Sequence, residues 1–337
     1  MHYRTLLTPL LFAAMPSVAQ IPVSISALHP IAIRLQQPYC DSSAFSHFEV
    51  LDERADTSRI GIHTCVPDFG RNYDRQLVFD RSAAAELSGY LNRRFARAGS
   101  SYTALVILRT LWLSDANYIR AEYLRHPERR LERTHIRMKA ELYAIRDGRY
   151  IPVLRFDTLQ TAMKKRILQE RSPYFEWGAN LALLLDELVD SASALAQDKV
   201  EASRSVNLDD IREFNASRFH APIDEDLPAR GVYASFEEFR NNTPSIQHFE
   251  IKLENHERVL YIQESGATYY THDVWGYCDG KDIYIMRDGV LCPAWKEGKA
   301  FYLPAAAATA HSLTEIRGRD YKQRSIYFVD MDTGDIY

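Results

Sequence analysis

The side chains best suited to chemistry in this sequence are aromatic and lie near its C-terminus. Residues 231–337 hold ten of the twenty tyrosines and two of the four tryptophans. Aromatic rings on one exposed sheet face stack on sugar rings or on a peptide partner, and the candidates for such a binding face are Tyr269, Trp275, Tyr277 and Trp295. Aromatic residues also suit the core of a small β domain. The pattern favours the core interpretation and leaves the binding face as the alternative.

Acidic residues near the same rings suggest a second kind of chemistry. Two carboxyl groups on either side of a groove can hydrolyse a glycosidic bond, and the candidates are Glu264, Asp273, Asp279 and Asp282. No nucleophile elbow, S-x-x-K motif or phosphate-binding loop is present in the sequence. The sequence therefore names no catalytic residue, and a hydrolase that acts on a polymer is only the alternative function.

Metal and cofactor motifs are also missing from the sequence. The eleven histidines form no H-E-x-x-H motif, and the four cysteines lack zinc-site spacing. The acidic run at residues 330–335 resembles the start of a calcium loop, but the sequence ends before the twelfth position, which would supply a bidentate carboxylate. We therefore predict a terminal turn with solvated acids, no metal and no cofactor.

The N-terminus predicts export. Positive His2 and Arg4 precede an apolar run at 6–15, and Pro16 and the small residues 17–19 follow, as in a secretory signal peptide cleaved after Ala19. The apolar run is too short for a membrane span, which needs about 20 residues, and no cysteine follows the cleavage point. We expect a periplasmic or secreted protein with no membrane span.

In an oxidising compartment the cysteines could pair. A disulfide between Cys40 and Cys65 is as well supported as two free thiols. Cys278 and Cys292 are expected to lie two strands apart and out of step, so this second pair is predicted to be unbonded.

Charge gives no indication of a nucleic-acid partner. Lysine and arginine number 41 against 45 aspartate and glutamate, for a formal net charge of −4. The densest basic run, residues 125–139, is interpreted as a solvated helix face, with binding to an anionic surface as the alternative.

The elements that would position these residues fall into two parts. Residues 20–198 read as an α+β domain. Strands are expected at 48–54, 59–65, 102–113, 134–145 and 150–156, with a turn at 55–58. Helices are expected from a cap at Asp80 or Ser82 to an end at Gly99, at 159–169, and from 174 onward. Residues 199–230 read as a linker with a short helix at 208–214. Residues 231–337 read as a smaller β-rich meander whose hairpin turns carry Asp-Gly at 279–280 and 288–289.

Three residues carry a family resemblance. Asp52, Arg54 and Gly61, followed by a helix and a strand, form a D-x-R…I-G pattern. Residues 48–196 thereby resemble the YajG-like domain of Gram-negative envelope lipoproteins, although this sequence lacks their lipidated cysteine. Segments 231–239 and 276–281 resemble exported Bacteroidota proteins of unknown role. Neither resemblance implies catalytic residues, and we interpret Asp52 and Arg54 as a structural ion pair.

Together these patterns favour an exported, non-enzymatic binding or envelope-assembly protein. Its partner would be an envelope protein or a glycan. Oligomeric state and ligand identity do not follow from the sequence.

Overall fold

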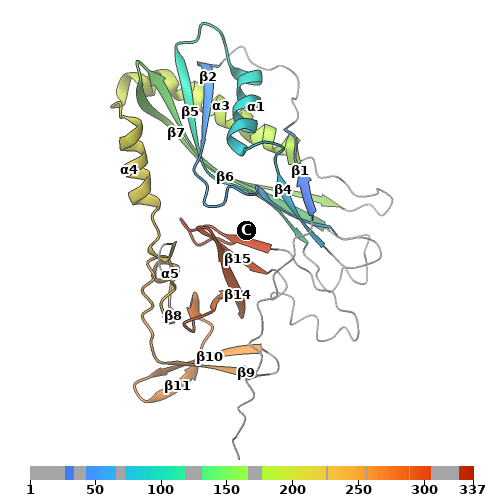
Figure 1. Cartoon of the computed structure of the whole chain (residues 1–337), viewed down its shortest axis with the longest axis vertical. Helices are drawn as coiled ribbons and strands as arrows, with labels where there is room; N and C mark the ends of the chain where they lie inside the picture. Colours follow the sequence, from blue (N-terminus) through green and yellow to red (C-terminus); the bar gives the residue numbers. More distant parts are fainter. Residues whose placement is uncertain are drawn as a thin grey trace, which may run out of the picture.

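The computed structural model has an α+β fold, as the sequence predicts (Figure 1). It describes residues 27–33, 43–65, 73–117, 131–165, 177–224, 227–254, 257–287, 289–304 and 326–337. The predicted signal peptide at 1–19 and Cys40 lie outside these residues, so neither export nor the Cys40–Cys65 disulfide is tested.

The first part of the described chain is a seven-stranded sheet with helices. The sheet order is β1-β4-β3-β5-β6-β7, and β2 pairs with β5. The elements are β1 (Ala27–Pro30), β2 (Phe45–Asp52), β3 (Gly61–Cys65), β4 (Tyr73–Val78), α1 (Ala83–Phe95), β5 (Tyr102–Asn117), β6 (Leu131–Arg146), β7 (Arg149–Lys165), α3 (Trp177–Ala202) and α4 (Leu208–Phe219).

Helices α1 and α3 cover one face of this sheet and make the main core. Of the two residues that the sequence offers as a cap, Asp80 and Ser82, it is Ser82 that caps α1, because its hydroxyl accepts a hydrogen bond from the Ala85 amide. The side chains of β6 point alternately to the two faces of the sheet, so every second residue from Ile136 to Ala144 is buried in this core. Figure 1 shows α1 and α3 on the sheet and α4 at the end of β5 and β7.

Strands β2 and β3 differ from the predicted arrangement. They do not pair with each other across a tight turn at 55–58 but follow one another along the same edge of β5. The intervening segment, 53–60, therefore forms a loop that reaches the C-terminal part. Gly61 is required where the chain rejoins β5, since a Cβ there would lie 2.0 Å from the Leu113 carbonyl oxygen.

Strand β7 is longer than predicted. The helix expected at 159–169 is wrong for its described portion, because β7 continues to Lys165, with Leu159 opposite Arg137. A polar segment becomes a strand here because the long neighbour β6 provides backbone partners throughout, a non-local effect that overrides local pattern.

A β-bulge interrupts β5 at Arg109. Leu108 faces Ala140 and Thr110 faces Lys139, so Arg109 is an extra residue opposite no partner of β6. Before the bulge Leu105 and Ile107 face away from α1 and α3 and pack with α4. The bulge gives β5 a local bend and sets the direction of the arginine side chain.

The C-terminal part is the predicted meander, in the order β16-β15-β14-β13-β12-β8, with a separate three-stranded sheet, β11-β10-β9. The elements are the 3-10 turn η2 (Pro222–Asp224), β8 (Gly231–Tyr233), α5 (Phe236–Arg240), β9 (Phe249–Glu254), β10 (Glu257–Glu264), β11 (Ala267–Tyr270), β12 (Gly276–Cys278), β13 (Ile283–Arg287), β14 (Val290–Glu297), β15 (Ala300–Pro304) and β16 (Ile326–Val329).

The two predicted hairpin turns of this meander differ. Arg287 pairs with Val290, as a two-residue turn requires, but Cys278 pairs with Ile283 and so encloses four residues. The prediction that Cys278 and Cys292 are not bonded to each other is confirmed, since both are buried and β13 lies between their strands.

Candidate functional site

The four aromatic candidates do not form one binding face. Tyr277 is fully buried and stacks on Tyr284, with ring centroids 4.8 Å apart. Trp275 packs edge-on against a ring of α5, and Trp295 lies 6.0 Å from Tyr302. Tyr269 is exposed on β11. Trp275 and Trp295 are half-buried, so binding at an aromatic surface remains a prediction for Tyr269, Trp275 and Trp295.

Of the four candidate carboxylates, Asp279 and Asp282 share one turn, and Glu264 lies on β10. The Asp279 carboxylate accepts hydrogen bonds from the Lys281 and Asp282 amides, at 2.9 and 2.8 Å, and so holds its own turn. Glu264 accepts a hydrogen bond from the Tyr269 hydroxyl. None of the four lines the pocket described below.

Aromatic residues instead join the two parts of the chain. Trp112, on β5, stacks on Phe328 with centroids 5.2 Å apart and contacts Tyr302 at 5.7 Å. All three are buried, in a cluster shared with Ile62 and Ala300. This aromatic interface fixes the C-terminal meander against the face of the sheet that α1 and α3 leave uncovered.

Buried charges reinforce this interface. The Lys139 ammonium lies 2.7 Å from Asp330 and 2.9 Å from Asp332, and Arg137 Nε lies 3.5 Å from Asp330. The basic run is thus wrong as a solvated helix face at its described end, because Arg137 and Lys139 are buried on β6. The terminal acids are not all solvated either, since Asp330 is buried.

The predicted ion pair is confirmed. The Arg54 guanidinium donates two hydrogen bonds of 2.8 Å to the two oxygens of Asp52. Its Nη1 also donates to the Arg59 carbonyl oxygen, at 2.7 Å, and so holds the 53–60 loop.

The same loop carries a second contact across the interface. The Tyr302 hydroxyl donates a 2.7 Å hydrogen bond to Asp56. Burial alone raises the pKa of Asp56, but hydrogen bonds from Ser58, Tyr302 and Arg59 outweigh it and lower the pKa to about 2. Asp56 is therefore ionised in the folded protein at neutral pH.

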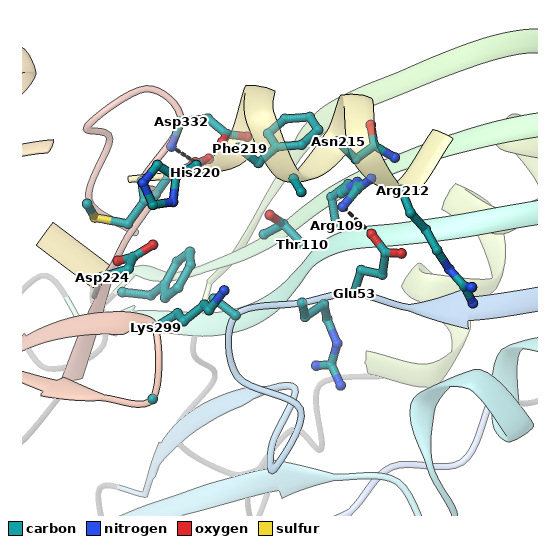
Figure 2. Close-up of a pocket in the computed structure, with 17 residues that line it drawn as sticks. Glu53, Arg109, Thr110, Arg212, Asn215, Phe219, His220, Asp224, Lys299 and Asp332 are labelled. Carbon is teal, nitrogen blue, oxygen red and sulfur yellow. Dashed lines mark hydrogen bonds and ion pairs between the residues drawn. The ribbon is translucent and has the colours of Figure 1, made fainter. Parts of the chain in front are cut away.

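A pocket of about 650 Å³ lies where β5, α4 and the C-terminal turns meet (Figure 2). Helix α4 forms one side, with Asn215 and Phe219 above Thr110 and Arg109 in the figure, and Lys299 lies on the opposite side. Its volume is in the range of small-molecule sites. The lining residues are Glu53, Arg54, Ala55, Arg109, Thr110, Arg212, Asn215, Ala216, Phe219, His220, Asp224, Gly298, Lys299, Phe328, Asp330, Met331 and Asp332.

Arg109, like Arg54, is a largely buried cation of this pocket. Its side chain is 11 % exposed, Nη1 binds the Glu53 carboxylate, and the guanidinium carbon lies 4.7 Å from the centre of the Phe219 ring. Within the described part of the chain, its Nε and Nη2 have no hydrogen-bond partner. Buried polar groups are nearly always hydrogen-bonded, so two such donors on one side chain call for an explanation.

Asn215 adds two more unpartnered atoms. It lines the pocket from α4 and is 2 % exposed, and among the described residues neither its amide nitrogen nor its amide oxygen has a hydrogen-bond partner. Leaving such groups unpaired costs about 1–3 kcal/mol each. A donor and an acceptor are therefore available beside the guanidinium.

The charged side chains that line the pocket are balanced, with four cations (Arg54, Arg109, Arg212 and Lys299) against four acids (Glu53, Asp224, Asp330 and Asp332). Arg54 is paired with Asp52, Arg109 with Glu53, and the two terminal aspartates with Lys139. Burial raises the pKa of Asp224 above its ordinary value. Lys299 is exposed at the pocket, and Arg212 is half exposed, with a carboxylate oxygen 3.8 Å away.

The described residues were compared with the requirements of a metal site and of a membrane-spanning helix. They contain no group of three or more His, Cys, Asp or Glu placed to hold a metal ion. None of the helices in the described ranges is long and apolar enough to cross a membrane. Comparisons with protein-family models, curated protein sequences and solved structures give no match.

Arg54 and the acidic residues Asp330 and Asp332 line the pocket and stand out in the sequence. The other residues that carry the argument for a site were not candidates, and only one of them left a signal in the sequence. Arg109 interrupts the apolar run 102–113, and a charged residue within a buried strand is unusual. Asn215 and Lys299 have no distinguishing local pattern, because the pocket brings them together from separate elements.

Proposed function

We propose that this protein is an exported, non-enzymatic binding protein whose ligand site is the pocket between the sheet, α4 and the C-terminal turns. One observation supports it most: buried Arg109 and Asn215 atoms without hydrogen-bond partners line a pocket of about 650 Å³. Export is supported by the signal-peptide pattern of residues 1–19. The partner class remains the one that the sequence favours, a component of the cell envelope.

We retain the non-enzymatic role that the sequence favours. The hydrolase alternative relied on Glu264, Asp273, Asp279 and Asp282, which lie outside the pocket, so no specific observation favours it.

Native mass spectrometry of protein purified from the envelope fraction tests the binding function. Ala216 is exposed on α4 and lines the pocket, so Ala216→Trp should fill it without disturbing the core. We expect a small-molecule adduct on the wild type that is lost in this variant. Ala202→Trp, at the exposed end of α3, is the matched control and should keep the adduct.

The same preparation tests export. N-terminal sequencing of the mature protein should begin at Gln20. A full-length chain recovered from the cytoplasm, or an adduct that persists in Ala216→Trp, would contradict the proposal.

A further inference from the structure

We propose that the ligand of this pocket carries a carboxylate, which binds the Nε and Nη2 edge of the Arg109 guanidinium. This inference depends on the binding function proposed above and specifies its ligand class. It follows from which atoms of Arg109 are used, from the groups beside them and from the charge at the pocket.

The unused edge of Arg109 has the geometry of a carboxylate site. The Nε and Nη2 hydrogens of a guanidinium point the same way and match the two oxygens of a carboxylate. This chain already uses that edge twice. Arg54 binds Asp52 through it, at 2.8 and 2.8 Å, and Arg94 binds Asp186 through it, with Nε 2.7 Å from Oδ1. Arg109 instead binds Glu53 through Nη1.

Glu141 is the internal group that competes for this edge. Its Oε2 lies 4.0 Å from Arg109 Nη2, beyond hydrogen-bond distance. The same carboxylate already accepts the Tyr143 hydroxyl at 3.0 Å and lies 3.4 Å from Arg155. Glu141 is therefore engaged elsewhere and leaves the hydrogen-bond positions of the Arg109 edge unfilled.

Phe219 packs against the Arg109 guanidinium. Arg109 Nε and Nη2 are shielded from solvent, and the Phe219 ring lies against the guanidinium. Phe219 is the last residue of α4, and His220 already has an extended backbone, with φ −64° and ψ 127°. A side chain at a helix end can move without unfolding the helix, so we infer that ligand binding displaces the ring.

The surrounding charges favour a carboxylate over a phosphate. Glu53 already neutralises part of the charge on Arg109, and a phosphate with nearly two negative charges would be repelled by it. Lys299 and Arg212 attract a single negative charge toward the pocket. The Asn215 amide is suited to a polar group next to the carboxylate, since it offers both a donor and an acceptor.

Isothermal titration calorimetry on the mature chain, after unfolding and refolding to remove any bound ligand, tests the ligand class with matched pairs. The pairs are glucuronate against glucose and L-glutamate against L-glutamine, with inorganic phosphate as a third probe. We expect at least one acid to bind at least about tenfold more tightly than its neutral partner. Phosphate should bind more weakly than that acid.

Two arginine variants locate the interaction. Arg109→Lys should weaken binding of the acid at least about tenfold, because an ammonium group cannot make the bidentate contact of a guanidinium with a carboxylate. Arg94→Lys removes the same type of contact from a buried ion pair outside the pocket and should leave acid affinity within about twofold. If Arg109→Lys does not fold, Lys299→Gln should still weaken acid binding, by about two- to threefold.

Each other result has a definite meaning. Acid binding that is unchanged in Arg109→Lys would overturn the assignment to Arg109. Phosphate binding as tight as that of the acid would overturn the carboxylate class. If no acid binds better than its neutral partner while native mass spectrometry still detects a pocket adduct, the inference fails and the proposed function stands. If the adduct is also missing, both fail.

Discussion

Replacing Lys139 with methionine removes the ammonium group that contacts both Asp330 and Asp332. The side chains of Lys139 and Asp330 are 8 % and 3 % exposed, and their closest atoms lie 2.7 Å apart. Removing one partner of a buried ion pair costs about 3–5 kcal/mol, because the other charge is left without compensation. Arg137 stays 3.5 Å from Asp330 and offsets part of that loss, so we expect a cost of about 3 kcal/mol.

Urea unfolding followed by tryptophan fluorescence measures this cost, since Trp112 is buried in the same interface. Asp330→Asn combined with Lys139→Met removes both charges, and the pair should recover about 1.5 kcal/mol or more relative to additive effects. The control is Lys252→Met. Its ion pair with Glu250 spans 3.5 Å with side chains 44 % and 51 % exposed, so the expected cost is below about 1 kcal/mol. Equal costs for Lys139→Met and Lys252→Met would refute a buried charge cluster at the interface.

Three further predictions concern the interface and the thiols. The pKa of Asp56 in the folded protein, about 2, lies below its ordinary value of 3.8, so the stabilisation is complete above pH 3.8 and is lost as the pH falls toward 2. Stability measured against pH should lose about 2 kcal/mol over that range, and Asp56→Asn should flatten the curve; an unchanged curve would contradict the role of the Tyr302 hydrogen bond. Trp112→Ala should cost about 3–5 kcal/mol in urea unfolding, and a cost below about 1 kcal/mol would show that the interface is open in solution. Cys278 and Cys292 should react with iodoacetamide in denaturant without a reductant and resist it when folded, since both are buried and burial raises the pKa of the Cys278 thiol; a disulfide-linked peptide in mass spectrometry would contradict this.

Local signals in the sequence predict most of the helices and strands, but they do not predict which strands pair with one another. The Ser82 cap, the alternation of β6 and the two-residue turn after Arg287 are each set by residues close in sequence, and the structure confirms them. The end of β7 and the separation of β2 from β3 depend on pairing with distant strands, and the sequence pattern did not predict either.

The site was less predictable than the fold for the same reason. The sequence shows that aromatic residues gather in 231–337, but it does not indicate that Tyr277 is buried while Tyr269 is exposed. The pocket combines β5, α4 and two C-terminal turns, so its polar atoms become neighbours only after the chain has folded.

The bulge at Arg109 gives β5 an unusual tolerance to shortening. Leu108 and Thr110 already face consecutive residues of β6, Ala140 and Lys139. Deleting Arg109 would therefore leave every β5–β6 pair in register and every side chain on its present face. Most single-residue deletions in a central strand reverse the inside and outside of all that follows, whereas this one would remove a guanidinium and leave a regular ladder. Which side chains of β5 face the core therefore does not depend on Arg109, the residue that we propose binds the ligand.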